Sequence, residues 1–165
     1  MISKLKWLKL EHLILGTLLV YVTLHVFEEW LFGFPDWALR RWGIPGYDVP
    51  KWLLHNVYFA FFLAVGYLVY RSNQDRWMPL GLGILVWGFL NSAIAHIAFT
   101  VIFLEYSPGI ITSLIFVYFA VMGLAQLRRA GRLSWKLIVP SVACGLLYWG
   151  VPMVVFIEVD KALGM

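Results

Sequence analysis

Long apolar stretches separated by short polar segments dominate the chain. Five of these stretches are long enough to cross ~30 Å of hydrocarbon as α-helices, which takes about 20 residues each. They cover residues 11–33, 52–70, 77–104, 108–127 and 135–158. The longest segment between them, residues 33–51, contains three prolines and three glycines and is expected to be a loop. The pattern predicts an all-α integral membrane protein, with residues 1–165 forming one domain, a bundle of about five transmembrane helices.

Prolines add two local expectations. Pro140 and Pro152 lie inside the last span and are expected to interrupt its helix. Ser107 fits the N-cap of the fourth span, and Pro108 fits its first helical position. The positive end of that helix could then stabilise a carboxylate or an anionic substrate group.

Composition agrees with a lipid environment. Hydrophobic residues make up 62% of the chain and charged residues 13%, with a mean hydropathy of +0.81. A soluble domain is usually ~45–50% apolar and ~25% charged. We interpret the net charge of +4 as loop charge that sets membrane orientation, and expect no nucleic-acid partner.

The basic residues divide unequally between the two sides of the predicted bundle. One set of loops holds Lys4, Lys6, Lys9, Arg71, Arg76, Arg128, Arg129, Arg132 and Lys136, and the other holds Arg40, Arg41, Lys51 and Lys161. The positive-inside rule then predicts a plasma-membrane (inner-membrane) protein with a cytoplasmic N-terminus and an external C-terminus. Tryptophans near the span ends, Trp7, Trp77 and Trp135 on one side and Trp30 and Trp52 on the other, fit interfacial belts.

Ionisable residues within the spans concentrate near one surface. The first span carries the stretch HVFEE at residues 25–29, and at ~1.5 Å per residue His25, Glu28 and Glu29 lie in its outer half. His55 and His96 of the next two spans fall at a similar depth. Charged side chains inside a membrane are costly, and they usually face the bundle interior and mark function. The sequence therefore predicts a polar site beneath the outer surface.

Helical spacing refines this site. Glu28 lies ~60° to one side of His25 and Glu29 ~40° to the other, which places the imidazole between the two carboxylates. Asn91 lies ~140° from His96 around an α-helix, on a flank of the face that carries the histidine.

The stretch HVFEE resembles the signature of the HXXEE domain family, small multi-helix membrane proteins of prokaryotes named for this motif. Asn91 followed by His96, and the turn YSPG at residues 106–109, are similar to further motifs of that family, and the resemblance extends over about residues 13–155. The family has no established reaction, so the resemblance implies important positions, not an activity. Those positions are His25, Glu28, Glu29, Asn91, His96, Tyr106, Pro108 and Gly109.

Our first hypothesis is a metal site in a membrane enzyme. Imidazole and carboxylate ligands suit Zn²⁺ or non-haem iron. The candidate metal ligands are His25, Glu28, Glu29, His55 and His96, and the candidate substrate-binding residues are Asn91, Tyr106 and Thr112. A metal-bound water could attack an ester or amide of a lipophilic substrate near the outer leaflet.

Two further hypotheses stay open at this point. The first is metal-free acid–base catalysis, such as an isomerisation, with His25, Glu28 and Glu29 as catalytic residues, because adjacent buried carboxyls repel and one of them should be protonated. Aromatic residues that could line its pocket include Tyr21, Phe27, Trp87, Phe99 and Tyr148. The second is a small transporter, proton relay or lipid-binding protein, since membrane-embedded glutamates and histidines also serve proton paths.

Overall fold

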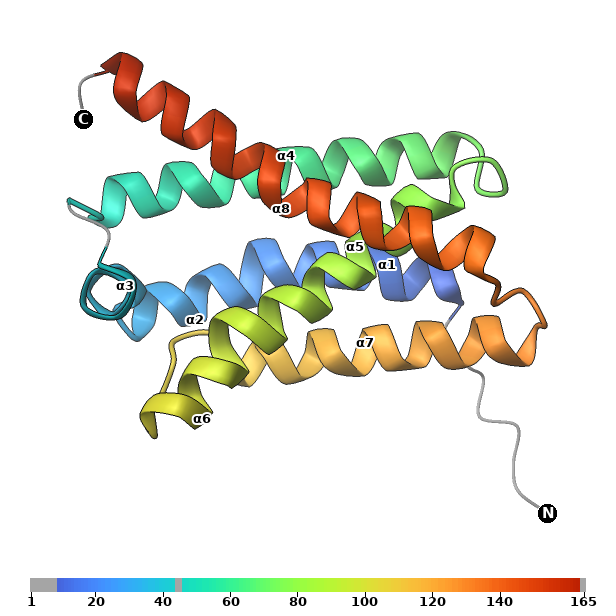
Figure 1. The fold of residues 1–165 in the computed structure, drawn as a ribbon, viewed down its shortest axis with the longest axis horizontal. Coiled ribbons are helices and arrows are strands. Elements are labelled where there is room, and N and C mark those ends of the chain that lie inside the picture. The colour runs from blue at the N-terminus through green and yellow to red at the C-terminus, as the bar shows by residue number, and fades with distance from the viewer. Residues whose placement is uncertain (1–8, 44–45, 164–165) are drawn as a thin grey trace.

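Five long helical segments run roughly parallel to the longest axis of the molecule (Figure 1). The computed structural model describes residues 9–43 and 46–163. The first segment joins α1 (Leu10–Val20), η1 (Tyr21–His25) and α2 (Val26–Leu31), and the third joins α5 (Met78–Leu90), η2 (Asn91–Ala98) and α6 (Phe99–Phe103). The other elements are α3 (Phe34–Trp42), α4 (Val49–Ser72), α7 (Ile110–Arg129) and α8 (Trp135–Leu163).

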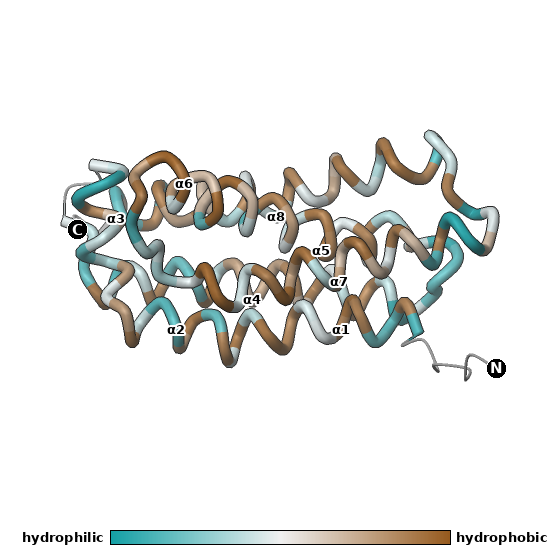
Figure 2. The backbone as a smooth tube through the Cα atoms, turned by 90° about the horizontal axis from the view of Figure 1, so that it is seen from below, coloured by the Kyte–Doolittle hydropathy of each residue, from teal (hydrophilic) through white to brown (hydrophobic). Residues whose placement is uncertain are grey.

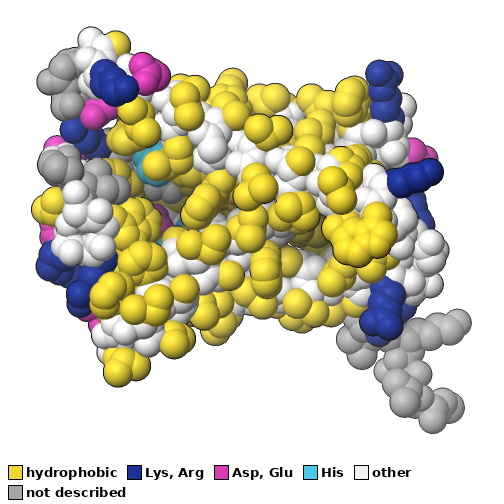
Figure 3. Space-filling model, in the orientation of Figure 1, with side chains coloured by type: hydrophobic (Ala, Val, Ile, Leu, Met, Phe, Trp, Pro, Cys, Tyr) yellow, Lys and Arg dark blue, Asp and Glu magenta, His cyan; other side chains and the backbone are white. Residues whose placement is uncertain are grey.

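The predicted number of spans is confirmed, because five helices of the described residues are long and apolar enough to cross a membrane. Their bounds are Leu10–Leu31, Val49–Ser72, Met78–Phe103, Ile110–Arg129 and Trp135–Ala162. Apolar residues cover the middle of the bundle and hydrophilic ones gather at its two ends (Figures 2 and 3).

The two ends of the bundle carry different elements. The first span begins at one end and α8 finishes at the other, which is the end that carries α3 (Figure 1). Which end faces the cytoplasm stays a prediction from loop charge. Lys4, Lys6 and Trp7, which contribute to that prediction, lie outside the described residues.

Three local expectations were wrong. Within the expected loop 33–51, α3 forms because Pro35 suits a helix start and the side chains of Phe34, Trp37 and Ala38 are buried on one face. The last span is one continuous helix through Pro140 and Pro152, because membrane helices tolerate proline where neighbouring groups satisfy the freed carbonyls.

The start of the fourth span also differs from the expectation. The N-cap of α7 is Gly109, with a φ of 99° and no side-chain cap of its own, and the helix begins at Ile110. Ser107 lies before this turn, and its hydroxyl donates to the Ala95 carbonyl of η2 at 3.4 Å instead of capping α7. The donors at the start of α7 must therefore find an acceptor elsewhere.

Close packing at the middle of the bundle fixes the position of α8. A Cβ added at Gly83 would lie 2.6 Å from the Cβ of Cys144, and one added at Gly145 would lie 2.6 Å from Cγ1 of Val86. These glycines let α5 and α8 approach closely. Beyond this contact α8 and the η2–α6 segment run apart towards the end that carries α3 (Figure 1).

An ion pair holds α3 across that end of the bundle. Arg41 of α3 donates through two guanidinium nitrogens to the two carboxylate oxygens of Glu105, which follows α6, and the Trp37 indole N–H donates to the same carboxylate at 2.9 Å. The hydrogen bonds from Arg41 lower the pKa of the Glu105 carboxyl below its usual 4.5. Its contribution is therefore fully present above the usual pKa and is lost as the pH falls through the lowered value.

Acidification should consequently loosen α3. After correction for intrinsic rates, we expect amide hydrogen exchange in residues 34–43 to be faster at about pH 3 than at about pH 7. A Glu105→Gln variant, which cannot be ionised, should exchange fast at both. Equal protection of α3 in the wild type and this variant at neutral pH would contradict the assignment.

Candidate functional site

Both histidines at the centre of the site lie in π-helical segments. His25 ends η1, and His96 lies within η2. Such segments are rare, and they occur frequently at functional sites. The i→i+5 pattern of η2 turns less per residue than an α-helix, which reduces the angle between Asn91 and His96 from the ~140° expected of an α-helix. Both side chains reach the first span, because Asn91 Nδ2 lies 3.4 Å from His25 Nε2 and His96 Nε2 lies 3.7 Å from Glu29 Oε1.

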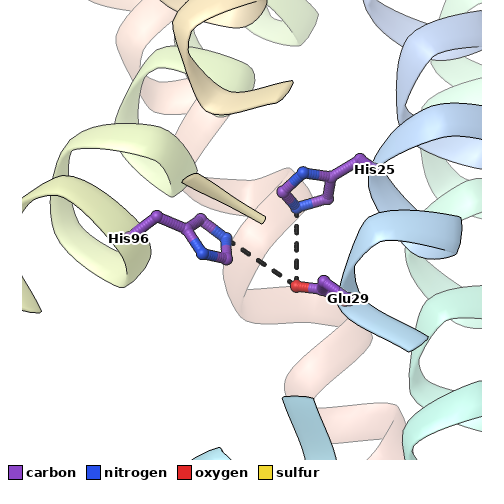
Figure 4. A group of neighbouring side chains, drawn as sticks. All are labelled: His25, Glu29 and His96. Carbon is purple, nitrogen blue, oxygen red and sulfur yellow. Dashed lines mark ion pairs between the residues drawn. The ribbon is translucent and has the colours of Figure 1, made fainter. Parts of the chain in front are cut away.

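His25, Glu29 and His96 come together inside the bundle (Figure 4). Glu29 Oε1 lies 3.5 Å from His25 Nε2 and 3.7 Å from His96 Nε2. One ligand atom from each residue falls within 4.8 Å of the others. The residues are 1%, 5% and 1% exposed respectively, so bulk water does not screen the group. Two imidazole nitrogens and one carboxylate oxygen therefore face one small volume.

Hydrogen bonds on both sides of the His25 ring define its tautomer. The Thr112 hydroxyl has one proton, which it can donate to Glu28 Oε2 at 2.7 Å or to the Gly109 carbonyl at 3.2 Å. In either case Thr112 Oγ1 must accept from His25 Nδ1–H, 2.7 Å away. When the ring is neutral, its proton is therefore on Nδ1 and the lone pair of Nε2 faces Glu29.

Asn91 supports the same tautomer independently. The indole N–H of Trp149 can only donate, and it lies 3.4 Å from Asn91 Oδ1, which fixes the orientation of the amide. The Asn91 NH₂ group consequently faces His25 Nε2 at 3.4 Å, where it can donate while no metal ion is bound.

His96 and Glu29 are oriented in a comparable way. Because the Ser107 hydroxyl donates to Ala95, its oxygen accepts from His96 Nδ1–H at 3.3 Å, which leaves the lone pair of His96 Nε2 facing Glu29. The Trp52 indole N–H donates to Glu29 Oε2 at 2.9 Å and leaves Oε1 for the two histidines. Partners of this kind orient metal ligands in known sites.

The cluster could hold a metal ion. Two nitrogen lone pairs and a carboxylate oxygen facing one another in a buried volume are mutually unfavourable unless a proton or a metal ion lies between them. A tetrahedral ion with bonds of ~2.0–2.2 Å separates its ligand atoms by roughly 3.3–3.6 Å. The 3.5 and 3.7 Å from Glu29 Oε1 are close to that spacing, and all three ligand atoms lie within 4.8 Å of one another, so the cluster could hold a metal ion if these atoms moved closer together.

Glu28 points away from this group and caps α7. Its two oxygens accept from the backbone N–H groups of Gly109, Ile111 and Thr112 at 3.2, 2.9 and 2.8 Å. The hydroxyls of Tyr106 and Thr112 add bonds of 2.6 and 2.7 Å. Glu28 thus supplies the acceptor that α7 lacks locally, and the carboxylate at the positive end of this helix comes from the HVFEE stretch itself.

The structure does not bring His55 into the cluster either. Its ring packs between Phe59 and Phe156, with centroids 4.6 and 4.9 Å away, and its Nδ1 lies 3.1 Å from the Tyr47 hydroxyl. Trp52, one helical turn earlier on α4, occupies the position against Glu29. His55 Nε2 is buried and has no hydrogen-bond partner among the described residues.

A cavity of about 520 Å³ adjoins the cluster. His25, Glu29 and Asn91 line one side of it, and His55 also lines it. Of the aromatic residues considered for a pocket, Tyr21, Trp87 and Phe99 contribute to its wall. Phe27 is exposed on the outside of the bundle, and Tyr148 packs against Gly66 and Gly83.

Several supporting residues were not anticipated from the sequence. Trp52 fitted an interfacial belt, Ser107 fitted a helix cap, and Trp149 carried no signal. Their roles depend on which helices are neighbours, and the spacing within one helix does not reveal this.

Gly109 lies directly beneath both imidazoles and cannot be replaced without moving them. A Cβ at this position would come within 2.6 Å of His96 Cε1 and 2.8 Å of His25 Cε1, and the φ of 99° disfavours any L side chain. We expect Gly109→Ala to displace the rings and weaken metal binding by at least about tenfold, comparable to the loss of an orienting partner. Isothermal titration with Zn²⁺ measures this, and Gly150→Ala, where a Cβ meets nothing within 4 Å, is the control.

The HVFEE stretch lies within a match to a known protein family. A family model described as proteins of unknown function with an HXXEE motif matches residues 17–123. The chain belongs to the HXXEE family. The match includes both histidines and both glutamates of the site, as well as the YSPG turn. No curated protein and no solved structure matches the chain.

The geometry gives the residues of the HXXEE motif separate positions in this chain. The histidine and the second glutamate, His25 and Glu29, belong to the metal-capable cluster. The first glutamate, Glu28, caps the start of α7 and is linked to His25 through the Thr112 hydroxyl.

Proposed function

We propose that this HXXEE protein is a metal-dependent membrane enzyme whose ion is bound by His25, Glu29 and His96. One observation carries the proposal: three acceptor atoms face one buried volume, and each ligand side chain is oriented by its own hydrogen-bond partner. Two histidines and one carboxylate are a ligand set of catalytic zinc sites and of non-haem iron sites. Three protein ligands leave a coordination position for water or substrate.

The reaction we propose is hydrolysis of an ester or amide in a lipophilic substrate. A bound metal ion lowers the pKa of coordinated water and polarises a carbonyl oxygen. The water oxygen bonds to the carbonyl carbon, the C–O or C–N bond breaks, and the leaving alcohol or amine takes up the proton. The adjoining cavity of about 520 Å³ supports a substrate that is mostly apolar.

The metal-free acid–base alternative has less support. It needs one of two adjacent glutamates as an acid and the other as a base. All five hydrogen bonds of Glu28 are accepted ones, which suits a fixed carboxylate and leaves no proton to donate. Its oxygens are also saturated by the start of α7.

Metal analysis of the purified protein tests the proposal. Protein purified in detergent without added chelator should contain about one equivalent of zinc or iron by inductively coupled plasma mass spectrometry. Treatment with a chelator and desalting should remove the metal, and titration with Zn²⁺ or Fe²⁺ should restore one equivalent. Protein that neither contains nor takes up a transition metal would refute a metal-dependent function.

A further inference from the structure

The cavity beside the metal-capable cluster of His25, Glu29 and His96 reaches the apolar side of the bundle. Ile94 of η2 and Ile157 of α8 both line it, and they are 46% and 43% exposed on the surface that the apolar belt covers. They lie on the two segments that run apart beyond the close contact of α5 and α8 (Figure 1). The space-filling view shows histidine surface (cyan) within the yellow belt at this end (Figure 3). The cavity therefore has an opening towards the hydrocarbon of a membrane.

The end of the cavity nearer the charged surface is covered. Phe34 of α3 and Tyr47 line it there, and both are 4% exposed. Trp37 and Ala38 of α3 pack in the same buried cluster. The Arg41–Glu105 ion pair fastens this helix across the bundle. Among the residues that the structure describes, a ligand therefore has an apolar lateral entrance and no comparable aqueous one through α3.

The charges of the cavity select against an anionic ligand. Among the described residues, no lysine or arginine lines it, and Lys51, on the neighbouring turn of α4, pairs with Asp160. Within the described part of the chain, Glu29 is the one carboxylate in the lining. An anionic headgroup would be buried beside this carboxylate without a basic partner, which is costly unless the bound metal ion alone offsets it.

Uncharged polar groups of a ligand would find hydrogen-bonding partners in the cavity lining. His55 Nε2 lacks a hydrogen-bond partner among the described residues and belongs to a ring in the cavity wall. The Asn91 amide lies on the side of the metal cluster. These atoms can bind the hydroxyl, ester or amide oxygens of a ligand whose chain lies against the aromatic walls. A volume of about 520 Å³ is within the ~300–1,000 Å³ range of small-molecule sites.

We propose that the substrate is an uncharged single-chain lipid with a hydroxyl, ester or amide headgroup, and that it enters from the membrane between α8 and the η2–α6 segment. The polar head lies between the metal cluster and His55, and the chain leaves past Ile94 and Ile157. This proposal rests on the proposed function, because it assigns the substrate class of the same site.

Photolabelling in nanodiscs tests the proposal without requiring turnover. The probe is a monoacylglycerol with a diazirine in its acyl chain, used with protein in phosphatidylcholine nanodiscs, and labelled residues are mapped by mass spectrometry. We expect label on the cavity-lining residues Met153 and Phe99. Excess monoolein should reduce it at least tenfold, whereas anionic lysophosphatidate should reduce it less than twofold.

Substitutions at the entrance provide the second part of the test. Ile94→Trp and Ile157→Trp should each reduce cavity labelling at least fivefold, because a larger side chain at an exposed rim fills the opening without disturbing the core. Leu68→Trp, at a side chain of α4 that is 66% exposed, is the matched control and should leave labelling unchanged. Label spread evenly over the apolar surface, equal competition by lysophosphatidate, or no effect of either rim variant would overturn the proposal.

Failure of the metal-dependent function and failure of the lipid proposal give different results. Wild-type protein stripped of metal by a chelator keeps every side chain of the cavity lining, so it should still be labelled there. Specific labelling of a protein that takes up no metal refutes the metal-dependent function and leaves the lipid cavity standing. A metal-loaded protein without specific labelling refutes the lipid proposal alone.

Discussion

His25→Ala, Glu29→Gln and His96→Ala are each expected to reduce bound metal from about one equivalent to less than about a tenth of one. Loss of an orienting partner alone typically costs ~10–100-fold in metal affinity, so loss of one of three ligands should exceed ~100-fold. The glutamine in Glu29→Gln retains the shape of the side chain and can still accept from Trp52, but it removes the anionic ligand. Mass-spectrometric metal content and Zn²⁺ titration of each purified variant measure the effect.

The chain offers matched controls for these substitutions. His12→Ala changes an exposed histidine of the same first span, and His55→Ala changes one that lines the cavity without joining the cluster. Both should keep about one equivalent of metal. If His55→Ala loses the metal while His96→Ala keeps it, the ligand assignment is wrong. Thermal unfolding of every variant separates loss of the site from loss of the fold.

Glu28→Gln is expected to destabilise the fold by about 2–4 kcal/mol. The carboxylate accepts five hydrogen bonds at the start of α7 and is 6% exposed. A glutamine offers one oxygen in place of two and directs an NH₂ group at backbone donors. A buried donor left without an acceptor costs ~1–3 kcal/mol, and the favourable interaction of an anion with the helix terminus is lost as well.

Unfolding by sodium dodecyl sulfate in mixed micelles, followed by circular dichroism, measures this change in stability. Glu29→Gln should be less destabilising than Glu28→Gln when both are compared without metal, because Glu29 caps no helix. Thr112 links Glu28 to the Nδ1 proton of His25, so Glu28→Gln should also weaken metal binding by about 10–100-fold without abolishing it. A Glu28→Gln protein as stable as the wild type would show that another group satisfies α7.

The adjacent glutamates illustrate what one helix can and cannot reveal. Their spacing correctly places Glu28 and Glu29 on either side of His25, since neighbouring residues point ~100° apart. It does not reveal that α7 begins opposite Glu28 or that the two lone pairs meet beside Glu29. Equal roles for the two carboxylates were therefore a reasonable expectation from the motif, and packing made them different.

For the histidines, depth in the bundle predicted their location better than helical face did. The hydropathy pattern puts His25, His55 and His96 at one level of the bundle, and all of them lie near the cavity or the cluster. The direction of each ring depended on details that periodicity does not predict. Asn91 and His96 of η2 both reach the first span, whereas Trp52 takes the position against Glu29 that His55 was expected to share.

The sequence by itself determined the number of spans, the layer in which polar groups gather, and the family to which the chain belongs, because apolar length and buried charge leave few alternatives in a membrane. Only the tertiary structure decided that Glu28 caps α7, that Glu29 joins His25 and His96, and that α8 leaves a cavity beside them. Each of these depends on contacts between residues that are distant along the chain, and those contacts arise only when the five helices pack together.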